Sequence, residues 1–156
     1  MIRIINAEAK HVDQIVKLWK ELEKLHHELD RFFTLRADAE ENFIKFITDL
    51  IESSNSTVLV ALSDDNVVGY ITGTMDEYPP VYERKDCGMI YDLYVSEAFR
   101  NQHVGTDLVR RLVSWFNTAK QQRIEVRVVS TNHIALSFWK KIGFKVYIHQ
   151  LYLEKD

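Results

Sequence analysis

The stretch DLYVSEAFRNQHVGTDLVRRLVSWF, residues 92–116, joins a strand to a helix through a short polar loop. Apolar residues alternate before the loop and recur at helical spacing after it. The first amides of a helix have no partner within it, and the helix dipole is positive at that end. A loop with Arg100 and Gly105 is therefore suited to phosphate, because arginine adds charge and glycine lets the backbone approach a ligand. By spacing alone, a plain strand-to-helix turn with a solvated Arg100 explains the run equally well.

The composition is typical of a globular domain that buries a core. The 156 residues are 46% hydrophobic and 28% charged, which favours a single domain over residues 1–156. No apolar run approaches the roughly 20 residues that cross a membrane, and the first residues do not resemble a signal peptide. The single Cys87 and the net charge of −3 argue against a disulfide, a cysteine-built metal site and nucleic acid as a partner. We expect a cytoplasmic protein without a metal or a membrane partner.

Hydrophobic periodicity predicts an α/β (α+β) fold with a mixed sheet of about six to seven strands and helices on both faces. Asp38 and Glu41 fit a capping box at the start of the second helix, and the cluster 64–66 fits a hairpin turn. Gly143 fits the left-handed position that ends a helix. The expected strands are 2–6, 57–63, 67–75, 88–95, 124–130 and 144–154, and the expected helices are 8–29, one from residue 38, 104–120 and 132–143.

Two motifs give the sequence a family resemblance. The run from Val95 through Arg100 to Gly105 resembles the acyl-CoA loop of the GNAT acetyltransferases, which is Arg or Gln, two residues, Gly, one residue, then Gly or Ala. NHIALSFWKKIGF, residues 132–144, resembles the family's N-x-x-A-x-x-x-Y-x-x-x-G-F helix. The order of strands and helices agrees as well, so the resemblance covers nearly the whole chain. Within the family the chain looks closest to the small histone/polyamine-type enzymes.

The resemblance implies the GNAT fold, with the sheet splayed between strands 88–95 and 124–130, and acetyl-CoA as co-substrate without a metal. The pyrophosphate is then expected on the loop amides, and the pantetheine arm on the backbone of the strand at 93 and 95, as β-strand addition by a cofactor. The expected cofactor-binding residues are Leu93, Tyr94, Val95, Arg100, Asn101, Gln102, His103, Val104, Gly105, Thr106, Asn132 and Trp139.

Two positions depart from the family pattern. His103 replaces the first glycine of the loop, so its side chain either points away from the phosphates or donates to them. Trp139 replaces the tyrosine often proposed to protonate the leaving thiolate, and an indole is no usable acid at neutral pH. Three interpretations are open: the CoA thiolate leaves without an acid, a neighbouring tyrosine such as Tyr94 serves as the catalytic acid, or acyl-CoA is bound without fast turnover.

Asp92 is the candidate catalytic residue on the acceptor side, at the point where the strand approaches the thioester. It is open whether it takes a proton from the amine, holds the ammonium group, or bonds backbone amides near a strand bulge. His26 and His27 are neighbours in a helix and do not share a face, so metal ligation by the pair is not expected. Phe32 and Phe33 lie in the connector between the first two helices, where they fit either a core plug or an acceptor pocket.

The leading functional hypothesis is an N-acetyltransferase that moves an acetyl group from acetyl-CoA to the primary amine of a small molecule or peptide by direct attack. The alternative is a catalytically weak or inactive acyl-CoA-binding sensor, which the tryptophan at position 139 keeps open. Many relatives dimerise, so a homodimer is possible on the resemblance.

Overall fold

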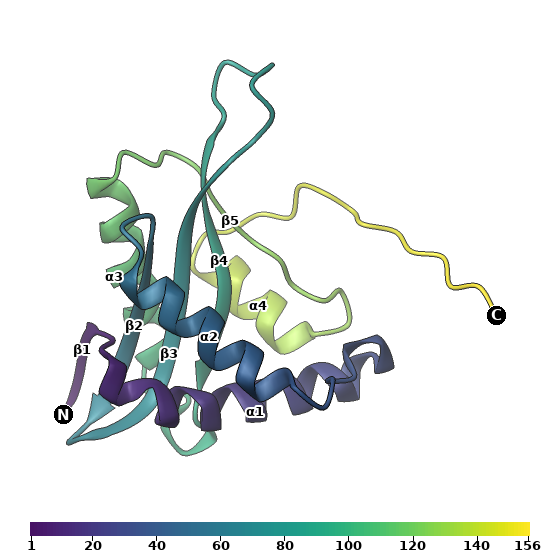
Figure 1. Ribbon diagram of the computed structural model, residues 1–156. Helices are drawn as coiled ribbons and strands as arrows, with labels where there is room; N and C mark the ends of the chain where they lie inside the picture. Colours follow the sequence, from purple (N-terminus) through teal and green to yellow (C-terminus); the bar gives the residue numbers. More distant parts are fainter.

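One mixed sheet runs through the computed structural model, which describes residues 1–156 (Figure 1). Neighbouring strands follow the order β1-β2-β3-β4-β5, antiparallel from β1 to β4 and parallel between β4 and β5. The strands are β1 Ile2–Asn6, β2 Ser56–Ser63, β3 Asn66–Glu77, β4 Asp86–Val95 and β5 Ile124–Val126. The helices are α1 Val12–Leu29, α2 Ala39–Glu52, α3 Val104–Thr118 and α4 His133–Lys141, with short 3-10 turns η1 Ala9–His11, η2 Arg31–Phe33 and η3 Glu97–Phe99.

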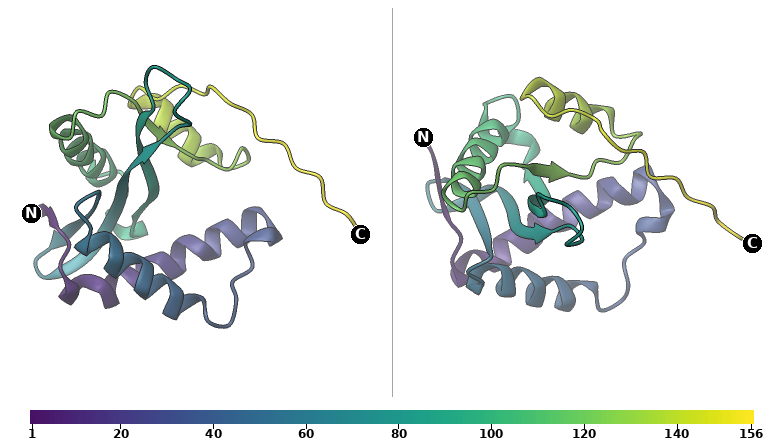
Figure 2. Two further views of the ribbon diagram at one scale, coloured as in Figure 1. Left: turned by 45° about the horizontal axis from the view of Figure 1, so that its top comes forward. Right: turned by 90° about the horizontal axis from the view of Figure 1, so that it is seen from above.

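The two faces of the sheet carry separate cores, as the alternation in β2 requires. Val58 and Val60 point to the side covered by α1 and α2, whereas Leu59 and Ala61 point to the side covered by α3 and α4. The views in Figure 2 show the sheet between these helical layers. On the α3 side, a Cβ added at Gly73 would come within 2.6 Å of Leu112, so the missing side chain lets α3 lie close to the strands.

The predicted α/β class with a mixed sheet and helices on both faces is confirmed, but the predicted strand count is too high. The strand expected at 124–130 ends at Val126, and residues 144–154, expected as a strand, form none. A strand needs a neighbour for its backbone hydrogen bonds. Residues 127–130 have left β4, and residues 144–154 have no strand beside them, so neither segment forms a ladder.

The start of α2 corrects a second prediction. Asp38 is the N-cap residue, but its carboxylate makes no capping bond. It pairs with the Arg36 guanidinium instead, through Nε at 2.8 Å and Nη2 at 3.1 Å. The nearby arginine therefore takes the carboxylate that the capping box needs. The hairpin turn and the helix end are confirmed, because Asp64 and Gly143 have the left-handed φ angles of 54° and 107°.

The sheet opens between β4 and β5. The two strands pair only at Gly88–Ile90 with Ile124–Val126, while β4 continues to Val95 against β3 on its other side. The predicted splay is therefore present, and it leaves one edge of β4 free over residues 91–95. None of the helices is both long enough and apolar enough to span a bilayer.

Candidate active site

The loop between β4 and α3 presents a row of free backbone amides. The N–H groups of residues 102–106 donate to no protein acceptor, and the first α3 bond of this region runs from Asp107 N–H to His103 O at 2.9 Å. Because these amides precede or open a 15-residue helix, they lie at the positive end of its dipole. The loop therefore has the donors and the field that bind phosphate groups.

Left-handed residues shape this loop. Asn101 has a φ of 59° and His103 a φ of 63°, so the chain alternates between left-handed and ordinary conformations. Such an alternation turns successive amides toward one side and forms an anion-binding concavity. It also explains why the family writes glycine at position 103, since a glycine adopts positive φ without strain. The His103 side chain is exposed.

Arg100 lies across the end of β4. Its Nε donates to Val95 O at 3.0 Å, and its guanidinium carbon is 5.2 Å from the centre of the Tyr94 ring. These contacts hold the arginine next to the free amides while leaving it exposed to solvent. The positive charge of the side chain and the helix dipole therefore act on the same point.

The free edge of β4 presents the backbone of Leu93 and the N–H of Val95, whose carbonyl oxygen accepts from Arg100 Nε. Asp92 N–H bonds Thr72 Oγ1 of β3 at 3.0 Å, and Ser96 N–H bonds Val68 O of β3 at 2.8 Å. Because successive residues of a strand turn their backbone groups to opposite edges, Leu93 and Val95 turn theirs away from β3, toward the opening. An extended ligand can pair with these groups as an added strand would.

Helix α4 borders the opening on the far side. Asn132 caps it, with Oδ1 accepting from Ala135 N–H at 3.1 Å. Phe138 lies near α3, since a Cβ added at Gly105 would be 3.5 Å from its ring. Trp139 is buried and packs edge-on against Phe138 and Phe144, with ring centres at 5.2 and 5.0 Å. Position 139 is therefore a core position as well as the place of the family's tyrosine.

A register shift between β3 and β4 aims Asp92 toward α1. The pairing slips between Ile71 and Gly73, an irregularity that redirects side chains. Tyr70 donates its hydroxyl to Asp92 Oδ2 at 3.1 Å. Burial raises the pKa of the Asp92 carboxyl from 3.8 to about 6, against the lowering effect of this hydrogen bond. Asp92 therefore titrates near neutrality, in the range useful to a general base.

Two α1 side chains complete this polar cluster. Glu23 Oε1 lies 3.5 Å from His26 Nδ1, and both side chains are largely buried. The hydrogen bond that His26 donates to Glu23 raises the pKa of His26 against the effect of burial, and the charges of Glu23 and Asp92 raise it further. In turn, the charge of Glu23 raises the pKa of Asp92 and the charge of His26 lowers it. Two carboxyls and one imidazole thus share a half-buried space beside the opening, which favours a cationic ligand.

Tyr94 lies on the same α1 side but serves a different contact. Its hydroxyl donates to Glu21 Oε2 at 2.9 Å. Burial and this bond raise the pKa of the phenol above its usual 10.0. A phenol whose proton is held by a carboxylate is a weaker acid than a free one. Tyr94 thus has less capacity to protonate a leaving group than an unpaired tyrosine.

Cys87 is the only thiol and is held in an inert state. Its Sγ lies 3.3 Å from Glu125 Oε2, and burial followed by that carboxylate raises the pKa of the thiol to about 12. A thiol that stays protonated is a poor nucleophile. The residues near the opening therefore offer no poised nucleophile for a covalent intermediate.

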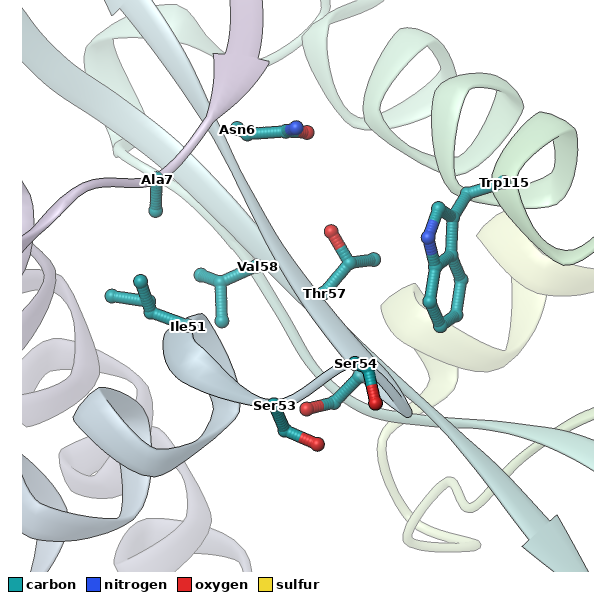
Figure 3. A pocket seen from close by; sticks show the side chains of 9 residues that line it. Asn6, Ala7, Ile51, Ser53, Ser54, Thr57, Val58 and Trp115 are labelled. Carbon is teal, nitrogen blue, oxygen red and sulfur yellow. The ribbon is translucent and has the colours of Figure 1, made fainter. Parts of the chain in front are cut away.

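A cavity of about 270 Å³ lies elsewhere on the molecule. It is bordered by the ends of β1 and α2, the start of β2, and Trp115 of α3 (Figure 3). None of its lining residues belongs to β4, to the loop 100–106 or to α4. The cavity is thus separate from the candidate site.

The structure brings together most of the residues singled out in the sequence and adds three. Asp92 lies on the free stretch of β4, the loop 100–106 follows that strand, and α4 lies beside it (Figure 1). Tyr70, Glu23 and His26 were not anticipated as members of the site. Glu23 and His26 are three residues apart on one helix face, a weak signal, but nothing local relates them to β4.

Comparisons with known proteins agree with this geometry. The sequence model of the acetyltransferase (GNAT) family matches residues 19–144. An uncharacterized N-acetyltransferase of Archaeoglobus fulgidus is 25% identical over 138 residues, which cover 88% of this chain and 89% of the relative.

Two crystal structures show the same fold. A mutant of a Bacillus halodurans protein superposes with a TM-score of 0.88 at 19% identity, over 98% of this chain and 99% of the other. A predicted acetyltransferase from Clostridium acetobutylicum, solved with acetyl-CoA, has a TM-score of 0.78 at 17% identity, over 99% and 96% of the two chains.

Proposed function

The chain belongs to the GNAT family of acetyltransferases, and on that premise we propose that it transfers an acetyl group from acetyl-CoA to a primary amine by direct attack. The family match covers residues 19–144, which include Asp92, the loop 100–106 and all of α4. The observation that carries the proposal is the opening itself. There, free loop amides and a free strand edge lie next to Asp92, a carboxyl with a pKa of about 6.

The loop amides of residues 102–106 and Arg100 are the groups that would hold the CoA pyrophosphate. They supply unpaired N–H donors and positive charge at one point. The free backbone of Leu93 and the free N–H of Val95 would bind the amides of the pantetheine arm, with Asn132 and Phe138 on the opposite side; the Val95 carbonyl accepts from Arg100. In support, a Clostridium acetobutylicum protein of the same fold was solved with acetyl-CoA.

Asp92 would act on the acceptor. The amine must lose a proton in order to become the acylated product, and a carboxylate with a pKa of about 6 is ionised at neutral pH and can accept it. The amine nitrogen forms a bond to the thioester carbon, the carbon–sulfur bond breaks, and the sulfur keeps the electron pair. The negative charges of Asp92 and Glu23 would also attract the amine while it is still an ammonium ion.

The leaving thiolate would depart without an acid from the protein. A thiol has a pKa of roughly 8.5, so its thiolate is a tolerable leaving group and takes a proton from water afterwards. Trp139 lacks an acidic proton, and the Tyr94 hydroxyl is committed to Glu21. We therefore propose that the thiolate leaves unprotonated, and that Tyr94 does not serve as its acid.

The test measures free CoA released from acetyl-CoA in the presence of a panel of primary amines. Turnover on at least one amine, dependent on both substrates, is the expected result. Calorimetry on the same protein measures acetyl-CoA binding. Binding without turnover on any amine would instead favour the acyl-CoA sensor, and absence of binding would remove both functions.

Two substitutions at Gly105 sharpen the binding test. A Cβ there makes ordinary contacts with Phe138 at 3.5 Å and Val95 at 3.8 Å, so Gly105→Ala should bind CoA like the wild type. Gly105→Val adds two methyl groups between the loop and α4 and should weaken CoA binding at least tenfold. Equal affinity in the valine variant would contradict the proposed loop site.

A further inference from the structure

We propose that Glu125 is a positioning residue that sets the width of the opening beside β4, and thereby the affinity of the protein for acetyl-CoA. Glu125 belongs neither to the loop 100–106 nor to the free edge of β4, so it acts on the ligand through the walls of the opening. The inference rests on the proposed function for its ligand, acetyl-CoA, and is independent of the acceptor. The Glu125 cluster is defined here as Tyr78, Cys87, Arg123, Glu125 and Tyr147.

Glu125 is a buried carboxylate at the fork where β4 and β5 part. It is the middle residue of β5, lies opposite Met89 of β4, and is 8% exposed. The two strands pair over only three residues each and separate beyond Ile90 and Val126. Parallel pairs are slightly less stable per residue than antiparallel pairs. A ladder this short therefore needs side chains to hold the two strands together.

Donors from several segments converge on this carboxylate. The Tyr78 hydroxyl, from the β3–β4 loop, lies 2.6 Å from Oε1 and 2.7 Å from Oε2. Cys87 Sγ of β4 lies 3.3 Å from Oε2, and Arg123 Nε, just before β5, donates to Oε2 at 2.7 Å. The Tyr147 hydroxyl, from the chain after α4, donates to Oε1. The carboxylate thus joins β5 to β4, to the β3–β4 loop and to the chain that leaves α4.

Tyr147 extends this connection to the wall that α4 forms. It follows soon after the helix ends at Lys141, and the Arg123 guanidinium lies over its ring at 4.6 Å. Between the helix and Tyr147, the Phe144 ring packs on Trp139 with ring centres 5.0 Å apart. The end of α4 is therefore held by the core and by the Glu125 cluster together. Because α4 borders the opening, the cluster fixes one wall of the opening as well as its fork.

The charge of Glu125 is what the cluster is built around. Burial raises the pKa of Glu125, but the hydrogen bonds from its four donors outweigh burial and lower the pKa to about 2. An ionised carboxylate accepts at both oxygens, whereas a glutamine of the same shape has one acceptor oxygen and turns N–H donors toward the rest. Glu125→Gln therefore leaves buried donors unpaired and loosens the cluster without creating a cavity.

A loosened fork lowers affinity because the ligand must then order the opening. With the cluster intact, the opening is preformed, and acetyl-CoA does not have to immobilise β5 and the end of α4. Without it, only a fraction of the molecules has the competent width, and the apparent affinity falls by that fraction. Once acetyl-CoA is bound the fork is closed again, so kcat at saturating acetyl-CoA should stay within about threefold of the wild type.

Calorimetry with acetyl-CoA tests the effect on affinity. Glu125→Gln should weaken binding by about tenfold or more, the order expected when buried donors lose a charged partner. The KM for acetyl-CoA should rise in parallel, while the KM for the amine stays unchanged. Tyr147→Phe removes one donor and keeps its ring, so it should weaken binding less. Glu40→Gln is the matched control, because Glu40 pairs with Lys20 at 2.6 Å on the α1–α2 side, and it should bind like the wild type.

Amide hydrogen exchange tests the fork itself in the absence of ligand. Gly88 N–H donates to Arg123 O across the fork at 2.8 Å, and Ser96 N–H donates to Val68 O at 2.8 Å at the other end of β4. In Glu125→Gln, exchange at Gly88 should become about tenfold faster or more, since the local opening free energy falls, while exchange at Ser96 stays as in the wild type.

The two measurements separate the possible failures. Wild-type affinity in folded Glu125→Gln, unchanged exchange at Gly88, or an equal loss of affinity in Glu40→Gln would each overturn the inference. If Glu125→Gln does not fold, Tyr147→Phe carries both measurements. A wild type that binds no acetyl-CoA would instead overturn the proposed function, while the exchange rates still decide whether Glu125 holds the fork.

Discussion

Tyr70 donates its hydroxyl to Asp92 across the irregular pairing of β3 and β4, at 3.1 Å. This bond links a fully buried tyrosine to the one carboxyl beside the opening whose pKa lies near neutrality. Burial raises the pKa of Asp92 and the Tyr70 hydroxyl lowers it, so the two effects oppose each other at the same group. Several measurable consequences depend on that balance.

The first prediction concerns the rate of acetyl transfer. Asp92→Asn cannot accept a proton, so kcat/KM should fall by about 10²–10⁴-fold, the usual contribution of a general base. In the wild type, kcat/KM should rise with pH through about 6 as Asp92 loses its proton. Calorimetry should show acetyl-CoA affinity unchanged, and high pH should partly restore the variant because more amine is already neutral. A variant with wild-type kcat/KM would show that Asp92 is not the base.

Stability should depend on pH through the same carboxyl. A folded pKa of about 6 against the ordinary 3.8 means that protonated Asp92 is favoured in the folded state. Its stabilising effect is complete below about pH 4 and is lost as the pH rises through 6. Asp92→Asn carries no charge, so relative to wild type it should gain roughly 1–3 kcal/mol between pH 4 and pH 8. Thermal melts of both proteins at both pH values measure this difference, and a variant whose stability relative to wild type is lower at pH 8 than at pH 4 would contradict it.

Tyr70→Phe should move the acid limb of the pH–rate profile upward. The hydroxyl stabilises the ionised carboxylate, so without it the pKa of Asp92 rises above about 6. Tyr78→Phe is the matched control, because Tyr78 also donates to a carboxylate, Glu125 at 2.6 Å, but outside the opening. Its acid limb should stay where it is in the wild type. A shift of the same size in both variants would assign the effect to general loss of packing.

His103→Gly tests the left-handed loop position. With a φ of 63°, histidine carries a strain that glycine lacks, so the substitution should stabilise the protein by up to about 1 kcal/mol. Gln102→Gly, one residue earlier and without a positive φ, should destabilise it, partly through the lost bond of its side chain to Ala98 O at 3.1 Å. Denaturant midpoints give both values. CoA affinity should stay within a few fold in His103→Gly, since the amides remain.

The parts of this site that are predictable from sequence are the local ones. The loop 100–106 and the cap at Asn132 follow from turn residues next to a periodic helix, and they lie where the motif spacing puts them. The cluster around Asp92 is different, because Tyr70, Glu23 and His26 come from two other elements and meet Asp92 only after the β3–β4 register slips. No spacing in the sequence encodes that slip.

Residues 144–154 show a second limit of sequence-based prediction. The alternation in residues 144–154 predicts a strand, but the segment forms none, because no strand lies beside it within the chain. Periodicity reports which faces need cover and does not report what covers them. The wrong strand count has this origin.

The last prediction concerns Trp139, which stands where the family has tyrosine. Its indole has no acidic proton, so Trp139→Phe should keep kcat within about tenfold of wild type while lowering the melting temperature, because the ring is buried against Phe138 and Phe144. Trp115→Phe is the control, because Trp115 packs against the same core from α3, beside Phe116, and borders the cavity that is separate from the opening. Trp139→Tyr should be as fast as wild type or faster, because a phenol can protonate the leaving thiolate. A loss of several orders of magnitude in Trp139→Phe, with fold and acetyl-CoA affinity intact, would mean that the indole itself takes part in the reaction.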